Sequence, residues 1–221
     1  MKKTIHLVNV DNFFPEMWEL TLPRIQAYAS RIGADVQIIS ERKNPDFPPT
    51  YEKTQIYELG KDSDWNILID ADVIVSPTAP DLTNLHWSRM DTVLFGGMFQ
   101  ASHWFAADQY FLRDGRNIGI AATMMVVPFT CHDFWTPLEF GYDVASTRTR
   151  RQHILDEYCF SRNLARYGLK FNGIGNDEHF VHIGTCADGV YGTENDETRE
   201  QKVERAKRVI KEMDGNFVKI D

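Results

Sequence analysis

Two acidic residues, Asp70 and Asp72, stand between two short apolar runs in the stretch WNILIDADVIVSP, residues 65–77. In an extended chain alternate side chains point to the same side, so both carboxylates would lie on one face. Neighbouring carboxylates repel each other unless a cation lies between them or one of them is protonated. Hard oxygen ligands favour Mg²⁺ or Mn²⁺, ions that usually share their coordination with phosphate oxygens. The pair therefore indicates a metal site for a phosphate-bearing substrate.

A structural explanation of the same pair stays open at this stage. Acidic side chains also cap turns between strands, where they accept backbone N–H groups and face water. The flanking runs, residues 67–69 and 73–75, are apolar and mostly β-branched, which is typical of buried strands. Because unpaired carboxylates are costly in such surroundings, the flanking residues favour the metal site.

The elements around the acid pair follow an α/β order. Residues 4–10 predict a first strand, and residues 22–32 carry apolar side chains at the spacing of one helix face, which Gly33 ends. Residues 35–40 predict a second strand and complete a β–α–β unit of a parallel sheet. We expect the later elements in this order: helix 51–60, the strand that begins at Trp65, strand 91–97, a mixed or helical segment 103–117, strand 118–128, helix 151–168 and an amphipathic helix 197–213.

The composition indicates a globular protein. The chain has 221 residues, 43% of them hydrophobic, so we expect residues 1–221 to form one domain with a sizeable core. A net charge of −8 argues against general binding of nucleic acid. The cysteines, Cys131, Cys159 and Cys186, show no paired spacing, which favours a reducing compartment. We find no apolar run of membrane-spanning length and no signal-peptide cleavage site, so we expect a cytoplasmic protein without a transmembrane segment.

Further motifs accompany the acid pair in a fixed order along the chain: Asn117-x-Gly119, Asp156-Glu157 and His182-x-Gly184. With the helix that precedes the acid pair, this order resembles the GT-A-fold glycosyltransferases that use nucleotide sugars, especially families 8 and 34. The small glycosyltransferase domains of large algal viruses are similar in kind. The resemblance covers roughly residues 4–184. It implies a single-domain, Rossmann-like GT-A fold with a central mixed, mostly parallel sheet flanked by helices.

The resemblance also implies roles for individual residues. Asp70, Asp72 and His182 would hold the metal ion. Asp156 and Glu157 would act on the donor sugar, although Glu157 stands where these families more often have Gln. The residues expected to bind the nucleotide sugar are Val8, Asn9 and Asp11 at the end of the first strand, together with Lys53, Asp70, Ala71, Asn117, Gly119 and Gly184.

One departure from the family pattern concerns the diphosphate. The Lys-Pro-Trp that commonly follows His-x-Gly in family 8 is replaced here by TCADGVYG, residues 185–192. Another cation must then meet the diphosphate, and we consider Lys53 and Arg151 as candidates.

The implied activity is that of a metal-dependent, retaining glycosyltransferase with Mn²⁺ or Mg²⁺ as its cofactor. It would move a hexose from a UDP-sugar, of the UDP-glucose kind, to a hydroxyl group of a glycan or glycoprotein acceptor. An inverting enzyme would instead need a base, for which Asp177 and Glu178 are candidates. Two competing hypotheses are a phosphatase of the haloacid dehalogenase type, with Asp70 as nucleophile, and a nucleotide-sugar binding module without turnover.

Two histidines lie near the third motif, and we expect only one of them to bind metal. Side chains three positions apart on an extended segment point to opposite faces, so at most one reaches the acid pair. His182 is followed two residues later by Gly184, which allows the backbone to come close to a phosphate. His179 is then expected to be structural.

Overall fold

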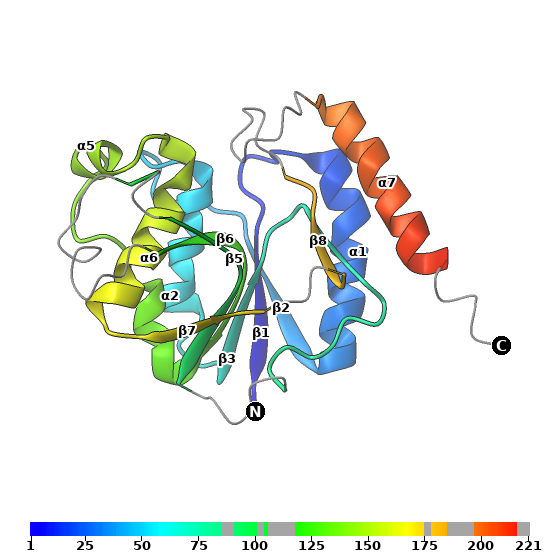
Figure 1. Ribbon diagram of the computed structural model, residues 1–221, viewed down its shortest axis with the longest axis horizontal. Helices are drawn as coiled ribbons and strands as arrows, with labels where there is room; N and C mark the ends of the chain where they lie inside the picture. The colour runs from blue at the N-terminus through cyan, green and yellow to red at the C-terminus, as the bar shows by residue number, and fades with distance from the viewer. Residues whose placement is uncertain (85–90, 101–103, 106–117, 175–177, 185–196, 216–221) are drawn as a thin grey trace.

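A computed structural model describes residues 1–84, 91–100, 104–105, 118–174, 178–184 and 197–215 of the chain (Figure 1). Helices and strands alternate along most of it. Short 3-10 segments occupy Pro49–Gln55, Phe129–Trp135, Ser146–Arg148 and Gln152–Ile154. The other elements are β1 (Lys3–Val8), α1 (Pro15–Ile32), β2 (Ala34–Ile39), α2 (Ile56–Leu59), β3 (Trp65–Ile69), β4 (Val73–Val75), β5 (Thr92–Gln100), β6 (Ile118–Pro128), α5 (Tyr142–Ala145), α6 (Leu155–Arg166), β7 (Lys170–Gly173), β8 (Phe180–His182) and α7 (Arg199–Gly215).

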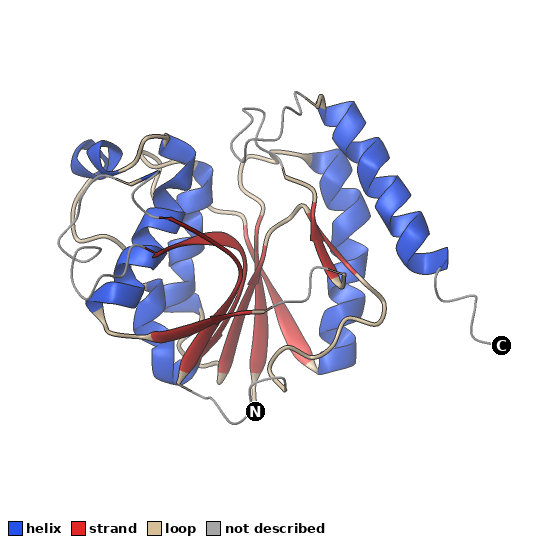
Figure 2. Ribbon diagram, in the orientation of Figure 1, coloured by secondary structure: helices blue, strands red, loops and turns tan. Residues whose placement is uncertain are grey.

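The central sheet has six strands in the order β2-β1-β3-β6-β5-β7. Strand β6 is antiparallel to both of its neighbours, whereas the other paired strands run parallel. Helices cover both faces of the sheet, with α1 and α7 on one side and α2, α5 and α6 on the other (Figure 2). The predicted α/β class with a mixed, mostly parallel sheet is confirmed.

Both faces of the central strands are buried, which explains their nearly continuous apolar sequence. Every residue of β3 is buried. Its side chains alternate, so that Ile67 and Ile69 join the core beneath α1 while Leu68 joins the core beneath α6. The strand that leads into the acid pair is therefore held firmly from both sides.

Helix α1 begins at Pro15, well before the predicted start at Leu22. The prediction is wrong because Pro23 lies inside the helix rather than in its first turn. Pro15 occupies the first turn instead, where a missing N–H costs nothing. The predicted end is correct, since Gly33 adopts the left-handed conformation (φ 67°) that terminates many helices.

Two other predicted helices begin with 3-10 turns, which are frequent at helix ends. The predicted helix 51–60 consists of the 3-10 segment Pro49–Gln55 followed by α2, and the predicted helix 151–168 contains Gln152–Ile154 followed by α6. The predicted segment 103–117 lies outside the described residues apart from Trp104 and Phe105. None of the helices in the described parts is long and apolar enough to cross a bilayer.

His6 is fully buried in β1. Its Nε2 lies 2.8 Å from Oδ1 of Asn66, and Nδ2 of Asn66 donates to the carbonyl of Gly60 at 3.1 Å. The second bond fixes the orientation of the amide, so Nε2 of His6 carries the proton. Nδ1 has no hydrogen-bond partner among the described residues. Burial lowers the pKa of His6 to about 4, although the hydrogen bond to Asn66 opposes this shift.

We expect His6 to make the fold sensitive to acid. Its pKa is about 4 in the folded state against an ordinary 6.5, so the unfolded state binds more protons between these values. The stabilisation is complete above the ordinary pKa and is lost as the pH falls towards the folded value, by about 3 kcal/mol. Urea unfolding at about pH 7.5 and about pH 4 measures this loss. His6→Gln keeps a donor for Asn66 and should lose less; equal losses in both proteins would contradict the prediction.

Candidate functional site

The acid pair lies in a tight turn between β3 and β4, at the carboxyl end of β3. The N–H of Val73 donates to the carbonyl of Asp70 at 3.0 Å, and the N–H of Asp70 donates to the carbonyl of Thr123 in β6 at 2.8 Å. The prediction of an extended chain through the acid pair is therefore wrong. Thr21 of α1 supports the turn, because its hydroxyl donates to the carbonyl of Ala71 at 2.5 Å. Ligands of open α/β sheets bind at this end of the strands.

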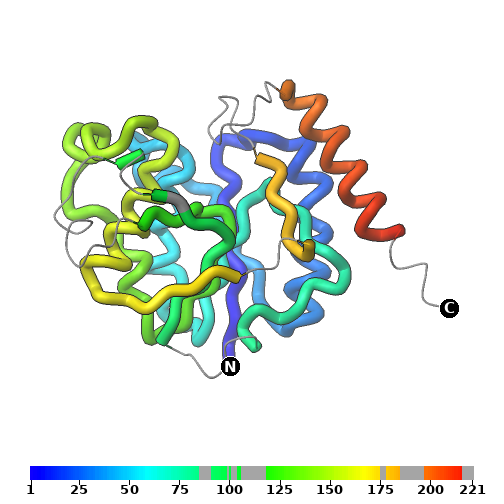
Figure 3. The backbone as a smooth tube through the Cα atoms, viewed as in Figure 1, coloured from blue at the N-terminus to red at the C-terminus, as the bar shows by residue number. Residues whose placement is uncertain are grey.

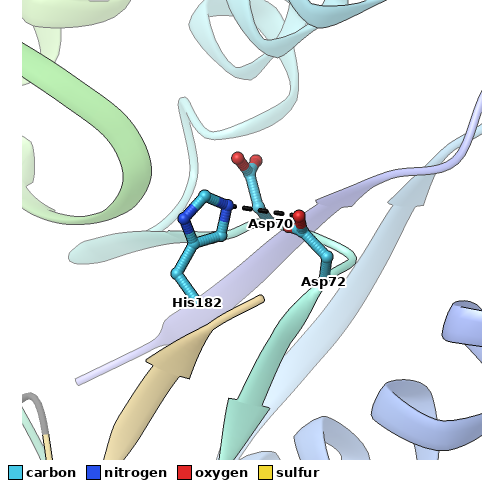
Figure 4. A group of neighbouring side chains, drawn as sticks. All are labelled: Asp70, Asp72 and His182. Carbon is cyan, nitrogen blue, oxygen red and sulfur yellow. Dashed lines mark ion pairs between the residues drawn. The ribbon is translucent and has the colours of Figure 1, made fainter. Parts of the chain in front are cut away.

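His182 reaches the acid pair from β8. Strands β4 and β8 form a separate antiparallel sheet in which Val73 pairs with His182. The N–H of Ile183 donates to the carbonyl of Asp72 at 3.0 Å, and Nε2 of His182 lies 3.2 Å from Oδ2 of Asp72. One potential ligand atom each from Asp70, Asp72 and His182 lies within 4.8 Å of the other two (Figure 4). The turn thus still brings both carboxylates to one place, together with the predicted histidine.

Burial and neighbouring charge set the protonation of these side chains. Burial raises the pKa of Asp72, but the imidazole of His182 outweighs it and leaves that pKa below its usual value. Burial likewise lowers the pKa of His182, and Asp72 outweighs it, so the pKa of His182 is raised. Burial raises the pKa of Asp70 to about 6 in spite of the ammonium of Lys53 nearby. Asp70 is therefore costly to ionise in this place without a further cation.

The donor set fits a divalent ion such as Mn²⁺ or Mg²⁺. Carboxylate oxygens suit both ions, and an imidazole can join them on Mn²⁺. Oδ2 of Asp72 is buried, and the described residues give it no well-aligned hydrogen bond, so a cation would satisfy it. Within the described parts of the chain, Asp70, Asp72 and His182 are the one group of three such side chains close enough to share an ion.

Lys53 neutralises the acid cluster from within the protein. Its side chain is 5% exposed and its ammonium lies 2.9 Å from Oδ1 of Asp70 and 3.0 Å from Oδ2 of Asp156. It also donates to the carbonyl of Ala122 at 2.8 Å. Burial lowers the pKa of Lys53, but the two carboxylates outweigh it and raise that pKa. An ammonium has three N–H donors, and these three partners occupy all of them. The contact of Lys53 with a diphosphate stays a prediction, and it would require Lys53 to give up one of these partners.

Two more acids enter the site from the first turn of α6. Oε1 of Glu157 accepts the N–H of Ala122 at 3.2 Å. Burial raises the pKa of Glu157 to about 8, and the charge of Asp156 adds to this effect. The side chain of Asp156 is 3% exposed, and its Oδ1 has no hydrogen-bond partner among the described residues. An unsatisfied buried carboxylate oxygen of this kind calls for a donor from a ligand or an ordered water.

These groups share one cavity of about 390 Å³. Its walls come from the end of β1, the start of α1, residues 48–50, the turn after β3 and the start of α6. The volume falls in the range of small-molecule sites. Of the residues predicted from the sequence, the cavity is lined by Val8, Asn9, Lys53, Asp70, Ala71, Asp72, Asp156, Glu157 and His182.

Several predicted residues lie away from this lining. Asp11 is exposed and pairs with Arg42 at 2.7 Å. Gly119 lies in β6 at the pairing position of Phe99. The guanidinium of Arg151 lies 5.4 Å from the centroid of the Trp104 ring.

The segment around β8 accounts for the other predicted residues. Gly184 follows β8 with a φ of 76°, a conformation that favours glycine. Glu178 is exposed, and its Oε1 lies 3.5 Å from Nε2 of His179. His179 therefore contacts Glu178, whereas His182 contacts Asp72. Asn117 and Asp177 lie outside the described residues.

The cavity also contains residues that sequence reasoning missed. Phe13 and Phe14 line it just before α1, and His153 lines it just before α6. The sequence held a weak signal for each of them. The two aromatic residues follow the first strand, and His153 precedes Asp156 by three positions, the spacing of side chains on one helix face.

We expect His182→Ala to weaken Mn²⁺ binding by about 10-fold or more, because disturbing even the outer partners of a metal site has an effect of this size. His179→Ala should leave Mn²⁺ affinity unchanged, since its imidazole contacts Glu178 instead. Titration of Mn²⁺ into each purified variant by calorimetry measures both affinities. Equal Mn²⁺ affinities in His182→Ala and the wild type would show that the third ligand lies elsewhere.

Comparison with known proteins supports the fold. No protein-family model and no curated protein matches the chain at a significant level. Among solved structures, a glycosyltransferase involved in the glycosylation of the major capsid of PBCV-1 has a TM-score of 0.54 and 12% identity, over 94% of this chain and 100% of that chain. The galactosyltransferase LgtC, solved with donor and acceptor sugar analogs, has a TM-score of 0.47 and 11% identity, over 99% and 97%. The similarity to the viral enzyme shows that the predicted GT-A fold is correct.

Proposed function

We propose that this chain is a metal-dependent glycosyltransferase that moves a hexose from a UDP-sugar to an acceptor hydroxyl of a glycan or glycoprotein. The observation that carries the proposal is the convergence of Asp70, Asp72 and His182 within 4.8 Å, in the same cavity as Asp156 and Glu157. Asp70, Asp72 and His182 suit a metal ion with phosphates, and the neighbouring carboxylates of Asp156 and Glu157 suit hydroxyl groups. The GT-A fold supports the same assignment.

The predicted metal ligands would help the diphosphate to leave. Departure of a nucleoside diphosphate builds negative charge on its phosphate oxygens, which a divalent ion stabilises when bound. Asp70, Asp72 and His182 would hold that ion. The hydrogen bond from Thr21 and the β4–β8 pairing hold the two acids and the histidine close together.

Asp156 and Glu157, in the first turn of α6, would contact the donor sugar. Oδ1 of Asp156 is buried without a hydrogen-bond donor among the described residues and would accept one from a sugar hydroxyl. Glu157 lines the same cavity, and its carboxylate would stabilise positive charge at the reacting carbon or attack it, which favours retention. Both roles need Glu157 in its ionised form.

The rate should therefore rise with pH. Because burial raises the pKa of Glu157 to about 8, most of this side chain is protonated at neutral pH, and the ionised fraction grows as the pH increases through that value. We expect kcat/KM to increase through about pH 8 and to reach a plateau near about pH 9. Glu157→Gln should lower kcat and abolish this rise. A profile that is flat from about pH 6 to 9 would contradict the role of Glu157.

A panel of nucleotide sugars, tested by thermal shift with and without Mn²⁺, examines the proposal as a whole. We expect a UDP-sugar to stabilise the protein only when Mn²⁺ is present. Stabilisation by GDP- or CMP-sugars alone would contradict the choice of base. Stabilisation by a UDP-sugar without hydrolysis or transfer would indicate a binding module.

A phosphatase of the haloacid dehalogenase type would be indicated by hydrolysis of phosphate esters without sugar transfer. That activity needs Asp70 as a free nucleophile. Both of its carboxylate oxygens lie within 3.1 Å of the Lys53 ammonium, a contact that opposes nucleophilic attack.

A further inference from the structure

Arg199 stands at the first residue of α7, where the sequence itself fixes the helix start. The N–H of Gln201 donates to Oγ1 of Thr198 at 3.3 Å, and the N–H of Thr198 donates to Oε1 of Gln201 at 2.7 Å. This reciprocal pair is a capping box. It satisfies backbone donors of the first turn with the helix's own side chains, and it determines where Arg199 projects.

The guanidinium of Arg199 lies on two aromatic rings of the cavity wall. Its central carbon is 5.0 Å from the centroid of the Phe13 ring and 5.3 Å from that of Phe14. Both rings line the cavity that contains Asp72 and His182. The ring of Phe13 belongs to a residue that is 51% exposed, so this wall borders the solvent. Arg199 is not itself among the residues that line the cavity, but it lies against the two rings that form this wall.

Helix α7 is fastened to the same part of the molecule. It packs beside α1 although the two helices are far apart in sequence (Figure 3). Arg205 donates to the carbonyl of Ile183 at 2.6 Å, next to His182. Arg24 of α1 forms a two-pronged pair with Asp214 near the other end of α7. These contacts hold Arg199 in place relative to β8 and the metal ligands.

The charge balance of the site requires a further cation. When ionised, the carboxylates of Asp70, Asp72, Asp156 and Glu157 outnumber the single ammonium of Lys53 by three charges. A divalent ion cancels two of them. The diphosphate of a nucleotide sugar then adds about two negative charges that neither Lys53 nor the divalent ion balances.

Arg199 is suited to this need. No described carboxylate lies within 4.0 Å of its guanidinium, in contrast to Arg24, Arg42 and Arg205, which all pair with acids. A ring face holds a guanidinium without occupying its N–H donors. Its planar donor fork matches phosphate oxygens.

We infer that Arg199, held on Phe13 and Phe14, binds the diphosphate of the nucleotide donor at the rim of the cavity. The inference rests on the proposed function. It assigns to α7 the cation for which the amino-acid sequence offered Lys53 and Arg151 as candidates.

Calorimetric titration of UDP in the presence of Mn²⁺ tests the inference. We expect Arg199→Gln to weaken UDP binding by about 10-fold or more, the usual size of a lost hydrogen bond to a charged group. Arg199→Lys should restore part of the loss, and added salt should reduce the difference. The affinity for Mn²⁺ alone should not change, which separates a phosphate contact from damage to the metal site.

Arg208→Gln is the matched control, because it removes the same charge from an exposed position of the same helix. It should leave UDP affinity unchanged. An equal loss in Arg208→Gln, or unchanged UDP affinity in Arg199→Gln, would overturn the inference and leave the proposed function standing. A wild-type protein that binds no UDP with Mn²⁺ would contradict the proposed function, and the role of Arg199 with it.

Discussion

Replacing Asp72 by Asn is expected to abolish Mn²⁺-dependent binding of the donor and to lower transferase activity by about 100-fold or more. An amide cannot supply the negative charge that holds a divalent ion, and Asp72 is the acid in direct contact with the third ligand, His182. The measurement is a Mn²⁺ titration by calorimetry, followed by turnover of a UDP-sugar at saturating Mn²⁺. The apo protein should remain folded, because an asparagine occupies the same volume.

The control for Asp72→Asn is Asp62→Asn, which makes the same change of charge at an exposed position outside the cavity lining. It should retain full metal affinity and activity. Asp70→Asn should lose metal in the same way as Asp72→Asn. Full activity in Asp72→Asn would show that the acid pair is not a metal site.

The sequence predicted that Asp70, Asp72 and His182 lie close together, because their signals are local. Asp70 and Asp72 follow a buried apolar strand, and His182 stands two residues before a glycine. The prediction brought these three side chains together through a wrong backbone, since the acids lie in a turn and not in extended chain. In this turn the two carboxylates still lie close together, so the error in the backbone did not change which side chains meet.

The fold was predictable where the apolar pattern is unambiguous. The strands β1, β3 and β6 are mostly buried apolar runs, and their predicted positions agree with the structure to within a few residues. The start of α1 was not predictable, because a proline reads as a boundary when only the sequence is seen. Met17 and Thr21, which precede Pro23 in α1, are buried, and the hydroxyl of Thr21 donates to the turn of the acid pair, contacts that the sequence does not reveal.

The contacts of Lys53 with Asp70, Asp156 and Ala122 could not be predicted from the sequence. Lys53 meets the turn after β3, the strand β6 and the helix α6, which converge only when the sheet forms. No spacing along the chain encodes that meeting. The same holds for Arg199, whose ring partners lie at the opposite end of the sequence.

Replacing Lys53 by Met should lower the free energy of unfolding of the metal-free protein by about 3–5 kcal/mol at neutral pH. Removing the ammonium leaves the buried carboxylates of Asp70 and Asp156 without their shared cation. Urea unfolding measures the loss. It should shrink as the pH is lowered, because protonation removes the unpaired charges.

Manganese should rescue Lys53→Met more than it stabilises the wild type. Without the ammonium the site is more negative by one charge, so it binds a divalent ion more tightly, and an ion that binds only the folded state stabilises it by mass action. The matched control is Lys61→Met, which breaks an exposed pair with Glu58 and should change stability by less than about 1 kcal/mol. Thermal unfolding of the wild type and of both variants, with and without Mn²⁺, compares the shifts directly. If Lys53→Met is as stable as the wild type without metal, or gains no more from Mn²⁺, then Lys53 is not the internal counter-ion of the acid cluster.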